Sequence, residues 1–101
     1  MAGELRFEWD AGKADTNFRK HKVSFELATL IFDDPCVFEF EQEREHGEVR
    51  YRAIGEVDGQ VLLVAYASYE ESGYEVVRLI SARKAEPHER RAYYRHAKAL
   101  R

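Results

Sequence analysis

The sequence predicts an α+β domain, in which helices pack against an antiparallel sheet of four to five strands. Residues 49–57, 61–69 and 74–83 have the composition of consecutive strands. The first two are joined by Asp58-Gly59, a strong signal for a two-residue hairpin turn. Helical patterns occur only before and after this region. Strands and helices are therefore separated along the chain, as is typical of α+β folds.

The N-terminal part predicts one short strand and two helices. Residues 5–9 alternate between apolar and polar side chains, which is typical of a strand. Asp10 can cap a helix that runs to about His21, with Ala14 and Phe18 facing inward. A second N-cap is Ser24, and the short helix after it ends at Asp33-Asp34-Pro35.

The rest of the chain predicts the sheet and a last helix. Residues 36–41 alternate as a strand, and the polar residues 42–48 form a connection to the strand 49–57. Pro87 suits the first turn of the last helix, where its missing N–H needs no partner. The expected order is strand, helix, helix, four strands and helix.

Composition restricts the class of protein. The 101 residues suit a single domain, 1–101, and 45% of them are hydrophobic, which supports a folded core. No apolar run approaches the roughly 18 residues that a membrane helix needs, and the charged N-terminus has no secretory-signal pattern. The single cysteine, Cys36, cannot form an internal disulfide. We expect a cytoplasmic protein that does not contact a membrane.

The charge is unevenly distributed. The net charge is −3, from 16 Lys and Arg against 19 Asp and Glu. Residues 76–101 nevertheless hold eight basic and two acidic residues, whereas residues 24–75 hold three and thirteen. A basic C-terminal quarter on an acidic body is typical of a surface that binds a polyanion, and equally of a solvated helix face.

Several kinds of site have no signature in the sequence. No glycine-rich phosphate loop and no G-x-S-x-G motif occurs. The four histidines are scattered without the spacing of metal ligands. Cys36 begins a predicted strand, where cysteines are usually buried and unreactive. We therefore expect no metal and no cofactor.

Arginines on the predicted strands are the strongest indication of function. Arg50 and Arg52 share one face of their strand. Arg78 has aliphatic neighbours on both sides, so its guanidinium needs water or an anion. A meander places these three arginines on one concave side. Arg83 and Lys84 end the last strand, and the C-terminal helix brings further side chains to the rim: Arg90, Arg91 and Tyr94.

Such a cluster suits cleavage of RNA without a metal. The 2′-hydroxyl attacks the adjacent phosphorus, and guanidinium groups stabilise the charge that develops on the phosphoryl oxygens. A base takes the 2′ proton and an acid protonates the leaving 5′ oxygen. Alternatively, each arginine pairs with a glutamate, and His21 only complements its helix dipole. The candidates for proton transfer are His21, Glu48, Glu89 and the tyrosines.

Taken together, the motifs resemble those of the BrnT family of toxins. The resemblance covers residues 7–94, in order and at the right spacing, and its most specific pair is Lys20-His21-Lys22-Val23-Ser24-Phe25-Glu26 with Ile80-Ser81-Ala82-Arg83. The family usually has glycine where this chain has Lys22, which predicts a changed loop conformation because lysine adopts positive φ poorly. The other matching segments are Phe7-Glu8-Trp9-Asp10, Lys13, Asn17, Phe32-Asp33-Asp34-Pro35, Gly47-Glu48-Val49-Arg50-Tyr51 with Ile54-Gly55, Arg78-Leu79, and Glu89-Arg90-Arg91-Ala92-Tyr93.

The resemblance implies a RelE-like fold and the toxin of a type II toxin–antitoxin system, an endoribonuclease that arrests translation. It implies a BrnA-like antitoxin with a ribbon-helix-helix part, so that operator DNA is contacted only indirectly, through the antitoxin. By resemblance, Arg50, Arg78 and Arg83 bind the scissile phosphate, and His21 or Glu89 transfers protons. Related toxins use a tyrosine in cleavage, and the resemblance implies this role for Tyr93 or Tyr94. The residues expected to bind RNA are Lys20, Arg52, Lys84, Arg90 and Tyr94.

Two other classes of function fit the same residues. A non-catalytic binding module would hold RNA or an acidic segment of an antitoxin without cutting anything. An interaction protein would accept an antitoxin at its sheet edge or groove after losing catalysis. A nuclease turns over RNA in excess, whereas a binding module only shifts it, with an affinity that falls as salt rises.

Overall fold

The chain is organised around a mixed sheet. The computed structural model describes residues 4–45 and 48–100. Within these residues, five strands form one sheet in the order β1-β5-β4-β3-β2. The last four strands are an antiparallel meander, and β1 lies parallel to β5. The strands are β1 (Leu5–Glu8), β2 (Phe38–Glu45), β3 (Glu48–Val57), β4 (Gln60–Glu71) and β5 (Tyr74–Lys84).

The helices begin at the residues that the sequence predicts. The side chains of Asp10 and Ser24 each accept a hydrogen bond from a backbone N–H of the first turn, at 2.9 and 3.0 Å. Such caps satisfy N–H groups that have no partner inside the helix. Pro87 occupies the first turn of the last helix, as expected. The helices are α1 (Ala11–His21), α2 (Phe25–Thr29) with its 3-10 continuation η1 (Leu30–Asp33), and α3 (Pro87–Ala99).

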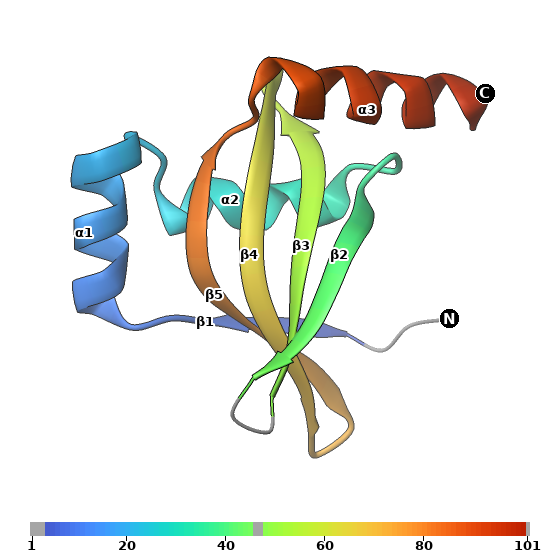
Figure 1. The fold of residues 1–101 in the computed structure, drawn as a ribbon. Helices are drawn as coiled ribbons and strands as arrows, with labels where there is room; N and C mark the ends of the chain where they lie inside the picture. The colour runs from blue at the N-terminus through green and yellow to red at the C-terminus, as the bar shows by residue number, and fades with distance from the viewer. Residues whose placement is uncertain (1–3, 46–47, 101) are drawn as a thin grey trace.

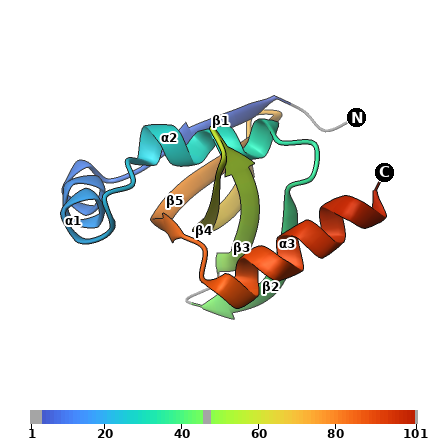
Figure 2. The same cartoon turned by 90° about the horizontal axis from the view of Figure 1, so that it is seen from above.

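The helices lie around the sheet on three sides. Seen from above, α2 lies on one face of the sheet and α3 on the other, while α1 lies beyond the β5 edge (Figure 2). In the front view, α3 crosses only one end of the strands (Figure 1). Within the described residues, no helix covers the rest of that face, and this uncovered part carries the predicted arginines of β3 and β5 (Figure 1, Figure 2).

Each face of the sheet has its own core. On the α2 side, Phe25 and Ile31 are fully buried against the strands. On the α3 side, Tyr93 and Ala97 pack against Ile54 of β3. Complete burial of a side chain of this size contributes about 1.5–3 kcal/mol. These contacts hold α2 and α3 on opposite faces of the single sheet.

Gly55 of β3 allows η1 to approach the sheet. A Cβ atom at this position would lie 2.7 Å from Cβ of Ile31 and 3.0 Å from its carbonyl oxygen. Both are shorter than a van der Waals contact, so a larger residue would push η1 away from β3. Glycine here is therefore required by packing.

The α+β class and the order of elements are confirmed, and they agree with the RelE-like fold that the resemblance implied. One detail was wrong: the sheet is mixed, since Leu5 pairs with Glu75 in a parallel register. The alternation of residues 5–9 correctly gave a strand, but alternation carries no information on direction. The chain passes through α1 and α2 before the meander, and this long connection makes a parallel pairing possible.

The expected connection over residues 42–48 was also wrong. β2 extends to Glu45 and β3 begins at Glu48, so only His46 and Gly47 separate them, and these two lie outside the described residues. β2 is an edge strand, and charged side chains are common on edges because they discourage pairing with other chains. Residues 42–45 were predicted as a connection because they are polar, although they belong to β2.

Candidate active site

Two arginines flank one alanine in a single row across the sheet. Arg50 of β3 lies opposite Ala67 of β4, and Ala67 lies opposite Arg78 of β5. The next row begins with Arg52, so the prediction that these arginines share one side is confirmed. Ala67 is fully buried beneath the first row, whereas Ala65 in the next row is partly exposed and lines a hollow. We call this set the arginine face: Arg50, Arg52, Ala65, Ala67, Arg78 and Ser81.

Glu48 lies between the two guanidinium groups of the first row. One of its carboxylate oxygens pairs with Arg78, and the other lies 3.9 Å from a terminal nitrogen of Arg50. Each of the three side chains is about one third exposed, so solvent reaches them. Nε of Arg50 is buried and makes no hydrogen bond within the described part of the chain. The row therefore contains one buried guanidinium N–H that no described residue satisfies.

A hollow of about 220 Å³ lies on the arginine face. Its wall includes Arg50, Arg52 and Ser81. A β-bulge shapes this wall, because Leu79 and Ser81 pair with neighbouring residues of β4 and Ile80 between them has no paired partner. The wall therefore carries two guanidinium groups, which are suited to binding a phosphate, together with the carboxylate of Glu43.

His21 and Lys20 lie in a second hollow, of about 480 Å³, between α1 and β5. Ile80 and Ser81 line this hollow as well as the first one. The two hollows are therefore neighbours on either side of the bulge. The structure brings His21 and Lys20 to the border of the arginine face, on the α1 side of β5.

Asn17 fixes α1 against β5. It is only 7% exposed, and its amide nitrogen donates to the carbonyl oxygens of Val23 and Ala82, at 3.0 and 2.9 Å. Its amide oxygen accepts from the backbone N–H of Ala82 at 3.1 Å. Three hydrogen bonds to buried backbone groups make the position of α1 well determined.

Arg83 and Glu89 are paired with each other. The guanidinium donates to both carboxylate oxygens, at 2.9 and 3.0 Å, and the backbone N–H of Glu86 donates to the same carboxylate at 2.7 Å. The hydrogen bonds from Arg83 outweigh burial and hold the pKa of Glu89 below its ordinary value. These two predicted site residues therefore stabilise the start of α3, and they lie at the end of β5, beyond Ser81.

The remaining expected RNA-binding residues surround α3. Lys84 is exposed at the end of β5, and Arg90 donates to the carbonyl oxygen of Ala85 at 2.9 Å. Tyr94 is 49% exposed, and its hydroxyl lies 3.2 Å from a carboxylate oxygen of Glu56. These residues lie around the covered end of the sheet, away from the row of Arg50 and Arg78.

Tyr93 is buried and has a structural partner. Its hydroxyl donates to Asp34 at 2.5 Å, and the same carboxylate accepts from the backbone N–H groups of Cys36 and Glu56. Burial and the bond to Asp34 raise the pKa of Tyr93. Burial opposes ionisation of Asp34, but the three hydrogen bonds bring its pKa below the ordinary value. Tyr93 therefore ties α3 to the segment before β2.

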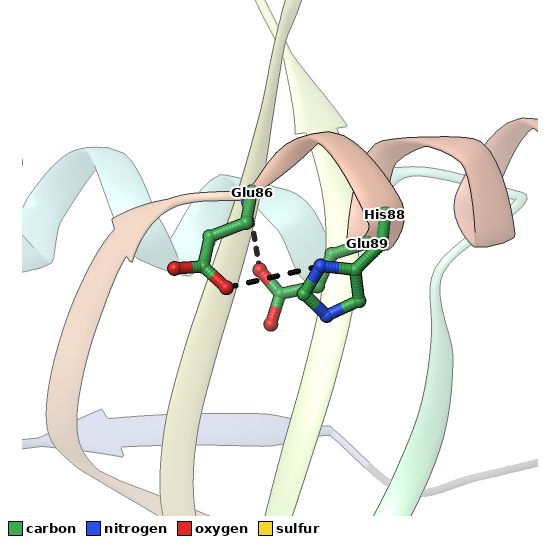
Figure 3. Close-up of side chains that lie close together, drawn as sticks. All are labelled: Glu86, His88 and Glu89. Carbon is green, nitrogen blue, oxygen red and sulfur yellow. Dashed lines mark hydrogen bonds and ion pairs between the residues drawn. The ribbon is translucent and has the colours of Figure 1, made fainter.

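One group of three potential metal ligands occurs among the described residues: Glu86, His88 and Glu89 (Figure 3). Their ligand atoms lie within 4.8 Å of one another. Glu89, however, already accepts hydrogen bonds from Arg83 and from the backbone of Glu86. A cation would have to compete with a guanidinium for this carboxylate, so the group functions as a helix cap.

Sequence reasoning assigned no role to Asn17, Ala65 or Ala67. The signal for Asn17 was a polar residue beside Ala14 on the inward side of a helix. The place of the two alanines could be recognised only from the strand register, which puts Ala67 between Arg50 and Arg78, and Ala65 between Arg52 and Ser81.

Comparison with protein families identifies the chain. The model of one family matches residues 9–89, which include the whole arginine face. That family consists of ribonuclease toxins of type II toxin–antitoxin systems, and this chain is therefore such a toxin. It belongs to the BrnT family, as the motifs indicated. Membership implies an RNA substrate and an antitoxin partner. A comparison with curated proteins gave no match. Among the described residues, no helix is long and apolar enough to cross a membrane.

Proposed function

We propose that this toxin cleaves RNA without a metal, by attack of the 2′-hydroxyl on the adjacent phosphorus, and that it thereby arrests translation. The observation that carries the proposal is the row of Arg50, Ala67 and Arg78, with Glu48 between the guanidinium groups. The two guanidinium groups stay charged at every relevant pH and supply the positive charge that the transition state needs.

The reaction needs one base and one acid. With the phosphate bound by Arg50 and Arg78, Glu48 takes the proton of the 2′-hydroxyl while the bond from O2′ to phosphorus forms. The bond from phosphorus to O5′ breaks, and His21 protonates the leaving oxygen from the α1 side. The products are a 2′,3′-cyclic phosphate and a 5′-hydroxyl. General acid–base catalysis of this kind contributes about 10²–10⁴-fold to a rate.

Glu48 is a better base than Glu89 in this structure. Glu89 is only 8% exposed and both of its oxygens accept from Arg83. Glu48 is about one third exposed and pairs with Arg78 through one oxygen, while its other oxygen lies 3.9 Å from Arg50, beyond hydrogen-bond distance. We assign Arg83 and Glu89 to the positioning of α3. Arg52 and Lys20 bind RNA within the two hollows, and outer contacts come from Lys84, Arg90 and Tyr94.

We also propose that the partner is a BrnA-like antitoxin with a ribbon-helix-helix part, through which the toxin reaches operator DNA, and that both act in the cytoplasm. Family membership supports this proposal. Copurification with the product of the neighbouring gene, followed by an operator-binding assay with and without the toxin, tests it.

The test of cleavage uses purified protein, freed of any partner, with total RNA in excess EDTA. The variants are Arg78→Ala and, as a matched control, Arg44→Ala. Arg44 is exposed on β2 opposite Val49, which puts it on the other side of the sheet from Arg50. We expect the parent and the control to cut RNA, and Arg78→Ala to be slower by about 10²–10³-fold.

Each other result has a definite meaning. Parental activity in Arg78→Ala would refute the phosphate role. Cleavage that stops in EDTA would refute the metal-free mechanism. A folded parent that binds RNA and leaves it intact, both alone and with ribosomes, would favour the binding module.

A further inference from the structure

The hollow between α1 and β5 has its own structural origin. β1 pairs with β5 only as far as Arg78, so no strand of the described residues lies beside the following part of β5 on that side. α1 occupies this place and is held there by Asn17. A helix stands further from a strand than another strand would, which leaves about 480 Å³ of space.

The helix presents positive charge to this space. Lys13, Asn17 and Lys20 follow one another at helical spacing, so they lie on one face of α1, and all three line the hollow. Both lysines are exposed, and neither has an ion-pair partner within the described ranges. The one carboxylate in the wall, that of Asp10, accepts the backbone N–H of Lys13 as the helix cap. The hollow therefore has unneutralised positive charge.

The hollow borders the arginine face at the bulge. Ile80 and Ser81 line both spaces, because the bulge turns two successive residues of β5 toward the surface. A strand of RNA whose phosphate lies at Arg50 and Arg78 can therefore continue across the bulge toward α1.

We propose that this hollow is the subsite for the nucleotide on the 3′ side of the cleaved bond, and that Lys13 and Lys20 bind the phosphate at the 3′ end of that nucleotide. This inference takes its polarity from the proposed function, in which Glu48 acts on the 2′ side and His21 on the 5′-oxygen side. The leaving nucleotide then lies on the α1 side of the bulge. Lysine suits this role because an ammonium group binds phosphate as a point charge without fixed geometry.

The experiment measures binding to an uncleavable 2′-deoxy dinucleotide, with and without a terminal 3′-phosphate. Binding is followed by NMR titration of the backbone amides. The variants are the double substitution Lys13→Ala/Lys20→Ala and a control of equal charge, Arg19→Ala/Arg95→Ala. Arg19 is exposed on α1 and Arg95 on α3, and neither lines the hollow.

We expect the 3′-phosphate to tighten binding to the parent and the control by about tenfold, and to shift the amides of α1 and Ser81. The lysine double variant should bind the two dinucleotides equally. No gain from the 3′-phosphate, or the same gain in the lysine double variant, would overturn the subsite. Because this measurement needs no cleavage, an inactive parent in the RNA assay would overturn the proposed function separately.

Discussion

The side chain of Asn17 makes to Ala82 the two hydrogen bonds that a neighbouring strand would make. Its amide oxygen accepts the N–H of Ala82, and its amide nitrogen donates to the carbonyl of the same residue. β1 stops pairing at Arg78, so this part of the edge of β5 would otherwise have unsatisfied backbone groups. One amide side chain thus replaces a piece of strand and allows a helix to stand beside the sheet.

We predict that Asn17→Ala lowers the free energy of unfolding by about 2–3 kcal/mol, because buried donors and acceptors lose their partners. Urea denaturation measures this change, and hydrogen exchange should show loss of protection at the amide of Ala82. Thr16→Ala, one position earlier on the exposed side of α1, is the control. Unchanged protection at Ala82 would show that α1 is held by other contacts.

A second prediction separates catalysis from binding at Glu48. Glu48→Gln removes the base but keeps the shape, so the cleavage rate should fall by about 10²–10⁴-fold. Binding of uncleavable RNA should become tighter, because Arg78 loses a competing carboxylate. Gel shifts with a 2′-deoxy oligonucleotide measure the binding. Weaker binding in Glu48→Gln would mean that Glu48 holds Arg78 in place rather than acting on the substrate.

A third prediction concerns the end of α1. Lys22 has φ of +62°, the left-handed conformation that costs a residue with a Cβ atom about 1–2 kcal/mol. Lys22 therefore takes up a conformation that glycine would adopt more easily, and its backbone N–H bonds to the carbonyl of Phe18. Lys22→Gly should raise the free energy of unfolding by about 1 kcal/mol, whereas Lys20→Gly inside the helix should lower it by about as much. Thermal denaturation of both variants provides the measurement, and a loss of stability in Lys22→Gly would contradict the account.

A fourth prediction concerns the loss of stability at low pH. In the unfolded chain the carboxyl group of Glu89 has its ordinary pKa of 4.5, and in the folded protein Arg83 lowers this pKa. The unfolded state therefore binds the proton first, so the stabilisation is complete above about pH 4.5 and is lost as the pH falls through the folded value. Urea denaturation between about pH 5 and pH 3 should show a smaller loss of stability in Glu89→Gln than in the parent. Equal losses would place the acid sensitivity elsewhere, for example at Asp34.

Local signals in the sequence predicted the helix starts, the hairpin at Asp58-Gly59 and the shared side of Arg50, Arg52 and Arg78. The helix starts and the hairpin depend on residues near one another in the chain, whereas the shared side of the arginines depends also on the pairing of consecutive strands in a meander. Other features depend on packing between segments that are distant in the chain, and these were not predicted. Phe18 was expected to face inward and is 49% exposed, because Asn17 occupies the inward position beside it. The pairing of Arg83 with Glu89 depends on how α3 docks, which no local pattern encodes.

The parallel pairing of β1 with β5 also orders the events of folding. Leu5 meets Glu75 across 70 positions, while the strands of the meander meet across short turns. Closing a long loop costs more chain entropy than closing a hairpin, so we expect the meander to form first and the N-terminal segment to dock last. The row of Arg50 and Arg78 lies entirely within the early part. The hollow between α1 and β5 forms only at this final step. The surface that binds the scissile phosphate therefore forms before the surface that binds the next phosphate along the RNA.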